Sequence, residues 1–138
     1  KRGLAYSTYS FNQGYSDGAV FGLYAGCSPA KTREVVELML SEFTKIAESG
    51  ITADELELAY GNISGGLALK FESTQARMSR LAGTALGTGH FVDLDEALTR
   101  YREVTQAQVQ QLAADILVRE KTIVAVGDVT VDTFNGLI

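Results

Sequence analysis

The sequence has 138 residues, with 46% hydrophobic and 21% charged residues, a composition that excludes a mainly disordered chain. A net charge of −5 without a Lys/Arg cluster argues against a nucleic-acid-binding surface. No apolar run approaches the roughly 20 residues that a membrane-spanning helix needs. A single cysteine, Cys27, cannot form an internal disulfide, and we expect a reducing, cytoplasmic setting.

The histidine count limits the chemistry of the chain. Catalytic zinc sites usually take at least two histidines from the protein, and His90 is the only one here. We therefore expect no metal ligand and no catalytic residue in this chain. His90 follows a glycine-rich helix end, where a structural or solvent-facing role is expected.

The first part of the chain predicts two strands. Leu4–Phe11 and Ala19–Ala25 are rich in Tyr, Phe, Val, Ser and Thr, with few helix-forming residues. The residues between them, 12–18, favour a turn. We predict an antiparallel hairpin from about residue 4 to 26.

A helix is predicted from Pro29 to Ser49. Proline suits the first helical turn, and Gly50 suits the left-handed position after the last turn. Apolar residues recur between these two ends at helical spacing: Val36, Met39, Leu40, Phe43, Ile46 and Ala47.

Three further helix starts share one pattern. Thr52, Asp93 and Thr105 are each followed three residues later by Glu or Gln, which is a capping box. Each cap stabilises its helix by about 1 kcal/mol. The stretch 56–88 is helical in composition but contains Gly61, Gly65 and Gly66, which predict a bend or the close approach of another backbone.

The run Thr122–Gly127 is apolar and bounded by charge and glycine, so it predicts a buried third strand. The tail after it is a short helix or a turn. The predicted order is β-β-α-α-α-α-β, an α+β fold whose antiparallel or mixed sheet has helices packed on one face. No linker or repeat divides the chain, so we expect one domain over residues 1–138.

Four patches together resemble the pitrilysin/insulinase zinc metallopeptidases, including the mitochondrial processing peptidase branch. The patches are the residues from Lys1 to Ser7 leading into Tyr9-Ser10-Phe11, the run Gly50–Leu56, the residues Glu72-Ser73 with Arg77-Met78, and Val104-Thr105 with the final Ala125-Val126-Gly127. Their order and spacing carry the resemblance, which covers nearly the whole chain. The first patch is the most specific, because any capped helix shows patterns like those of the second and fourth.

The resemblance implies a particular half of these enzymes. Their first-type domain carries an inverted zinc motif, H-x-x-E-H, and their second-type domain closes over it and helps to hold the peptide. The first patch is similar to the second type, and this sequence lacks H-x-x-E-H. We therefore expect residues 1–138 to be an incomplete C-terminal-type domain with the LuxS/processing-peptidase-like half-domain fold. Zinc would be bound outside this chain, which alone would be inactive.

Tyr6 is the one site residue that the resemblance implies. In active relatives the second-type domain supplies an Arg/Tyr pair that engages the substrate near the scissile bond, and Tyr6 matches the Tyr. The matching Arg position falls before Lys1, so Arg2 is not that residue. From the residues alone, an ordinary half-buried sheet tyrosine remains the alternative. Cys27 is expected to pack, and Glu72 and Arg77 to form an ion pair on a helix.

The expected function is that of a zinc-dependent endopeptidase at the level of the whole protein. This part would contribute a wall of the substrate chamber and Tyr6 as a substrate contact. Its partners would be peptide substrates and the zinc-bearing domain of the same protein or of a homologous subunit, and a homodimer of the chain is also expected. Two alternatives stay open: a non-catalytic, peptide-binding subunit of the same family, and an unrelated α+β interaction domain.

Overall fold

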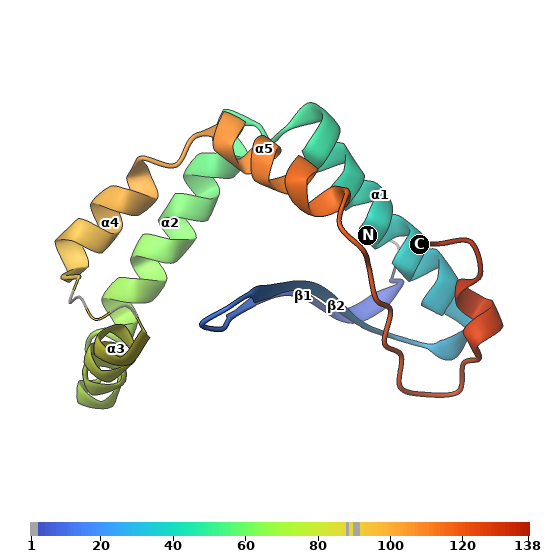
Figure 1. Cartoon of the computed structure of the whole chain (residues 1–138), viewed down its shortest axis with the longest axis horizontal. Helices are drawn as coiled ribbons and strands as arrows, with labels where there is room; N and C mark the ends of the chain where they lie inside the picture. Colours follow the sequence, from blue (N-terminus) through green and yellow to red (C-terminus); the bar gives the residue numbers. More distant parts are fainter. Residues whose placement is uncertain (1–2, 88, 90–91) are drawn as a thin grey trace. The chain divides into compact units, whose positions relative to one another are not determined.

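The hairpin predicted at the beginning of the chain is present in the computed structural model, which describes residues 3–87, 89 and 92–138. Strands β1 (Ala5–Gly14) and β2 (Ala19–Cys27) pair antiparallel and form a long ribbon (Figure 1). The Tyr15 backbone N–H donates to the Gly18 carbonyl oxygen at 2.8 Å and closes the connecting turn. His90 lies outside the described residues.

The register of the hairpin sorts its side chains onto two faces. Directly opposite residues of an antiparallel pair share a face, and alternate residues along a strand share it too. Tyr9 lies opposite Tyr24, and Phe11 lies opposite Gly22, so these residues define one face. Phe21 lies opposite Asn12 and belongs to the other face.

Helix α1 (Thr32–Ser49) packs against the face of the hairpin that holds Phe21. The Phe21 and Phe43 rings stack with 5.7 Å between their centroids. A short 3-10 turn, η1 (Pro29–Lys31), leads into α1 with proline at its start, as predicted. Gly50 has a φ of +73°, the left-handed conformation that ends the helix. One face of the hairpin is therefore covered by a helix.

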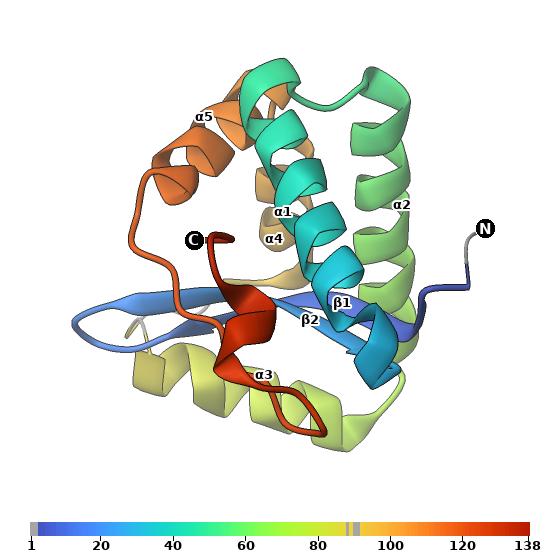
Figure 2. The ribbon, with the colours of Figure 1, turned by 90° about the vertical axis from the view of Figure 1, so that its right-hand side faces the viewer.

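The end of the chain returns to the beginning of α1. The Arg33 guanidinium donates to the carbonyl oxygens of Thr133 at 3.0 Å and Asn135 at 3.2 Å. Thr133 belongs to a short 3-10 turn, η2 (Val131–Phe134). Figure 2 shows this segment, in red, beside the first turns of α1. These contacts hold residues 131–135 within the same compact unit as α1 and the hairpin.

The remaining helices are α2 (Ala53–Lys70), α3 (Thr74–Gly87), α4 (Leu94–Arg102) and α5 (Gln106–Leu117). The predicted caps are confirmed. Thr52 and Glu55 form a complete capping box, Asp93 accepts from the Glu96 N–H at 2.7 Å, and Thr105 accepts from the Gln108 N–H at 3.3 Å.

The chain divides into two compact units: residues 1–48 with 113–138, and residues 49–112. The second unit is joined by polar contacts between its helices. Arg102 forms an ion pair with Glu57 at 2.5 Å and lies over the Tyr60 ring at 3.7 Å from its centroid. The Gln106 side-chain amide donates to the Ile51 carbonyl oxygen at 2.6 Å. The expectation of one domain over residues 1–138 stays a prediction.

The prediction of a third strand over Thr122–Gly127 is wrong for the part of the chain that the structure describes. The sheet there has two strands, and the run 122–127 has no regular structure. Val124 is 83% exposed and Val126 is 99% exposed. A strand requires a neighbouring strand for its backbone hydrogen bonds, and this apolar run pairs with none of the described residues.

The three glycines of α2 neither interrupt the helix nor admit another backbone. The helix continues from Ala53 to Lys70. Apart from the adjacent backbone of the helix, no atom of the described residues lies within 4 Å of the place where a Cβ would stand on Gly61, Gly65 or Gly66. The break falls later, at residues 71–73, where Ser73 accepts from the Ala76 N–H at 3.4 Å and begins α3.

The α+β class is confirmed: a two-stranded antiparallel sheet precedes five helices in the described residues. Three apolar residues of this part are buried, namely Val35 and Ala47 in α1 and Ala113 in α5. No helix among the described residues combines the length and the apolar character required to span a membrane.

Candidate functional site

Tyr6 lies at an irregularity of the hairpin. Ala5 pairs with Cys27 and Ser7 pairs with Gly26, so Tyr6 is the extra residue of a β-bulge. A bulge redirects the side chain that it carries and is frequent beside functional sites. Tyr6 is 82% exposed.

The Tyr6 ring lies across the neighbouring strand, over Gly26. A Cβ on Gly26 would stand 2.6 Å from one ring carbon of Tyr6 and 2.9 Å from its hydroxyl oxygen. Gly26 is nevertheless buried, which is consistent with cover by this ring. Since Gly26 pairs with Ser7, it lies on the face of Tyr9 and Tyr24, and the bulge therefore brings Tyr6 to that face.

The same arrangement recurs four positions earlier on β2. A Cβ on Gly22 would stand 2.3 Å from the Phe11 ring, so this ring also lies flat over a glycine of the partner strand. Between the two covered glycines, Tyr9 and Tyr24 stack at 4.6 Å with 21° between their planes. A side chain at either glycine would displace the ring that covers it.

These four rings form what we call the aromatic face: Tyr6, Tyr9, Phe11 and Tyr24. All four side chains are exposed. The sequence indicates only Tyr6 of these four as a site residue, and the other three are found from the structure. The alternation of Tyr9 and Phe11 places them on one face, but the glycines that let the rings lie flat are recognisable only once the register is known.

The other residues that the sequence singled out show ordinary roles. The Cys27 Sγ is partly buried and lies 3.8 Å from the Thr32 Oγ1 at the beginning of α1, which is a packing contact. The predicted Glu72–Arg77 ion pair is wrong, because the Arg77 Nε donates to the Phe71 carbonyl oxygen at 2.5 Å instead. A guanidinium that caps a backbone carbonyl at the end of α2 is structural.

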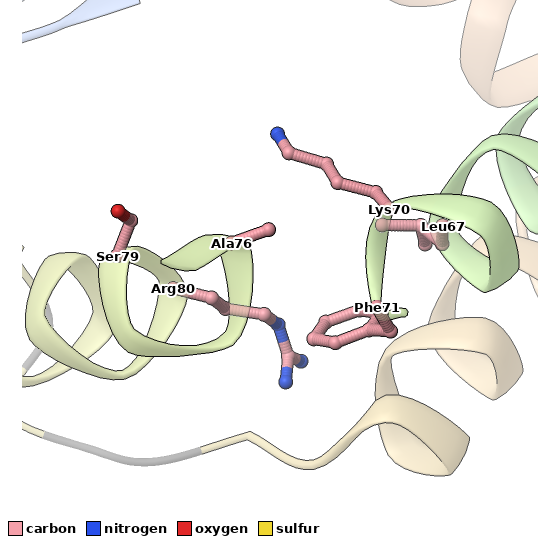
Figure 3. Close-up of a pocket in the computed structure, with 6 residues that line it drawn as sticks. All are labelled: Leu67, Lys70, Phe71, Ala76, Ser79 and Arg80. Carbon is pink, nitrogen blue, oxygen red and sulfur yellow. The ribbon is translucent and has the colours of Figure 1, made fainter. Parts of the chain in front are cut away.

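A hollow of about 290 Å³ lies beside the break between α2 and α3. It is lined by Leu67, Lys70, Phe71, Ala76, Ser79 and Arg80, and Figure 3 shows their side chains. The Arg80 guanidinium lies 5.1 Å from the Phe71 ring centroid and donates to the Asp93 carbonyl oxygen at 2.9 Å. The Lys70 side chain points in another direction (Figure 3), so the two cations do not converge on one position where an anion would bind.

The described residues offer no donor set for zinc. Metal sites in proteins draw on clustered His, Cys, Asp and Glu side chains. In residues 3–87, 89 and 92–138, no three such side chains are grouped closely enough to hold an ion. The residues present therefore do not fit a zinc site, and the aromatic face is the strongest candidate site of the described chain.

Comparisons with known proteins agree with the resemblance. A family profile described as "Peptidase M16 inactive domain" matches residues 1–61, which include the hairpin and the aromatic face. An uncharacterized zinc protease of Streptomyces coelicolor is 38% identical over 92% of this chain and 28% of its own length. Subunit 2 of the mitochondrial cytochrome b-c1 complex of Rattus norvegicus is 23% identical over 86% of this chain and 26% of its own length.

A solved structure shows the same fold. A chain of complex III2 from Candida albicans superimposes with a TM-score of 0.70 at 21% identity, over 78% of this chain and 26% of the other. This match supports the α+β assignment. The chain thus spans less than a third of the length of these relatives.

Proposed function

Because the chain belongs to the peptidase M16 inactive-domain family, we propose that it forms one wall of the substrate chamber of a zinc-dependent endopeptidase. Its relatives named as zinc proteases support the peptidase assignment at the level of the whole protein. The proposed partners are peptide substrates and a zinc-bearing domain, on the same protein or on a homologous subunit. A cytoplasmic location is part of the same proposal.

Tyr6 is the proposed substrate contact, and the bulge is the observation that carries this role. The bulge redirects Tyr6 onto the aromatic face, away from the face that packs on α1. An exposed phenol O–H donates a hydrogen bond, and a peptide carbonyl oxygen accepts one. A donor that meets the developing oxyanion stabilises the transition state more than the bound substrate.

Zinc would be held by residues outside this chain, since the described residues do not fit the metal. The metal would supply Lewis-acid chemistry for peptide hydrolysis. The residues described here would bind and orient the peptide. The chain by itself is proposed to be inactive.

The experiment is Tyr6→Phe in the intact protein that carries this sequence. The substitution removes the hydroxyl and keeps the ring over Gly26, so the hairpin should fold unchanged. We expect kcat/KM for peptide cleavage to fall on the order of a hundredfold, mostly in kcat, as for the loss of one oxyanion donor.

Tyr15→Phe is the matched control. Tyr15 is also an exposed tyrosine of the hairpin, but it lies in the turn. Its substitution should leave kcat/KM unchanged. Unchanged kinetics in Tyr6→Phe would overturn the role of the Tyr6 hydroxyl.

A non-catalytic subunit is the second candidate function. It is favoured by the match to cytochrome b-c1 complex subunit 2, which is named as a subunit of a larger assembly. The intact wild-type protein prepared for the Tyr6→Phe experiment also distinguishes the two candidate functions. If the intact wild-type protein holds no zinc and cleaves no peptide, the chain belongs to a non-catalytic member of the family.

A further inference from the structure

We propose that the aromatic face binds an extended peptide segment that carries large apolar side chains at every second position. This inference rests on the proposed peptide-binding role and adds the class of peptide. Three of the four rings adjoin one another: Tyr9 and Tyr24 stack at 4.6 Å, and Tyr9 and Phe11 have centroids 6.3 Å apart. The fourth ring, that of Tyr6, lies over Gly26 on the same face. Exposed apolar patches of this kind mark interaction sites.

The ring spacing matches the repeat of an extended chain. Alternate side chains of a strand lie about 6.7 Å apart along its axis. The Tyr9 and Phe11 centroids are 6.3 Å apart along β1, so a peptide that lies along this strand presents alternate side chains in step with the rings. Intervening side chains of that peptide point away from the face and are free to vary.

The low relief of the face favours a peptide over a bulky protein surface. The Tyr6 and Phe11 rings lie over Gly26 and Gly22, where no side chain lifts them from the strands. Such rings present their π-faces, on which apolar and aromatic side chains pack. The opposite face of the hairpin is occupied by Phe43 of α1, so one face is left for a ligand.

Charge narrows the class of peptide further. Asp17 is the only charged residue between Gly3 and Cys27, and it lies between the two strands. A charged peptide side chain placed on the rings would lose water and gain no opposite charge from the hairpin. The contacting positions of the peptide are therefore apolar.

The area of the face argues against a second copy of the chain as its occupant. Given their exposed fractions, the four side chains offer on the order of 450 Å². A stable protein–protein interface buries roughly 800 Å² on each partner. A short peptide needs no more than the face provides.

The test measures binding without hydrolysis. The intact protein, with a chelator present, is titrated into a short fluorescein-labelled peptide in which Phe alternates with Ser, and Kd is measured by anisotropy. We expect weaker binding of a peptide that has the same residues with the Phe side chains consecutive, and of one with Lys in place of Phe.

The variants are Tyr9→Thr and Tyr24→Thr. Threonine favours strands, so the hairpin keeps its fold while a ring is lost, and circular dichroism verifies this. Each variant should raise Kd roughly two- to tenfold, the size of one aromatic contact. Tyr15→Thr, in the turn, should leave Kd unchanged.

Three outcomes would overturn the proposal. The first is an unchanged Kd in both ring variants, and the second is equal affinity for the alternating and the consecutive peptide. The third is a concentration-dependent dimer, seen by sedimentation, that both ring variants abolish, because a second copy would then occupy the face. Failure of the proposed peptidase activity leaves this test intact, since it involves no cleavage.

Discussion

Gly26 and the Tyr6 ring occupy neighbouring space at the beginning of the hairpin. The ring covers the glycine, and the bulge at Tyr6 is what brings it there. The Tyr6 side chain is largely exposed, so its ring is free to move if Gly26 gains a side chain. A substitution at Gly26 should therefore change the position of the Tyr6 ring without lowering the stability of the chain.

Gly26→Ala tests this separation. The new Cβ would stand 2.6 Å from the ring and displace it, whereas alanine in a strand costs less backbone entropy than glycine. We expect a thermal midpoint equal to or above that of the wild type, together with a lower kcat/KM in the intact protein. Differential scanning calorimetry and peptide-cleavage kinetics measure the two quantities.

Gly14→Ala is the control for this variant. Gly14 ends β1, and no atom of the described residues other than its chain neighbours lies within 4 Å of its Cβ position, so neither quantity should decrease. Wild-type cleavage kinetics in the Gly26→Ala variant of the intact protein would contradict the link between the ring's position and its proposed role.

At the scale of single residues, the sequence identified Tyr6 only through the family resemblance. If β1 were regular, Tyr6 would lie on the face opposite Tyr9, because residues three apart in a regular strand point to opposite sides. The bulge instead brings Tyr6 to the face of Tyr9, and the presence of the bulge depends on how β1 pairs with β2. Pairing is not encoded in a local pattern, so the aromatic face could not be assembled from the sequence.

Helix starts are the elements that the sequence predicted best. Thr52 illustrates the reason: its hydroxyl accepts from the Glu55 N–H at 3.2 Å, and the Glu55 carboxylate accepts from the Thr52 N–H at 2.8 Å. Both contacts lie within four residues of the chain, so local sequence determines them. The break between α2 and α3 was misplaced because glycine lowers helix propensity without ending a helix.

Thr52→Ala should remove the cap of α2. The substitution leaves the Glu55 N–H without its acceptor, and we expect a loss of about 1 kcal/mol in the free energy of unfolding. Urea denaturation followed by circular dichroism measures this change.

Ser41→Ala provides the reference for Thr52→Ala. Ser41 is exposed in the middle of α1, where alanine is the better helix former, so stability should stay equal or rise slightly. Equal destabilisation by both variants would show that the cap does not contribute.

At the scale of the whole molecule, the fold class was predictable and the size of the sheet was not. Segregation of strands and helices along the chain is sufficient to indicate an α+β fold. The run 122–127 has the composition of a buried strand, yet Val124 and Val126 are exposed. Composition reports that a segment is able to form a strand, and only a neighbouring strand determines whether it does.

Amide hydrogen exchange tests whether residues 122–127 are paired with a strand or unpaired. In the 138-residue chain, amides of residues 122–127 pair with no strand of the described part, so they should exchange much faster than those of β1 and β2. Mass spectrometry of peptic peptides from both regions gives the two rates. Equal protection would mean that the run is paired after all.

The stacked Tyr9–Tyr24 pair also has an optical consequence. The chain has no tryptophan, so its near-ultraviolet absorption and emission come mainly from six tyrosines. Four of them, Tyr6, Tyr9, Tyr15 and Tyr24, belong to the hairpin region. With two rings held 4.6 Å apart in fixed orientation, the electronic transitions of the pair are coupled. Near-ultraviolet circular dichroism of the unlabelled chain is thus dominated by the surface that we propose meets the peptide.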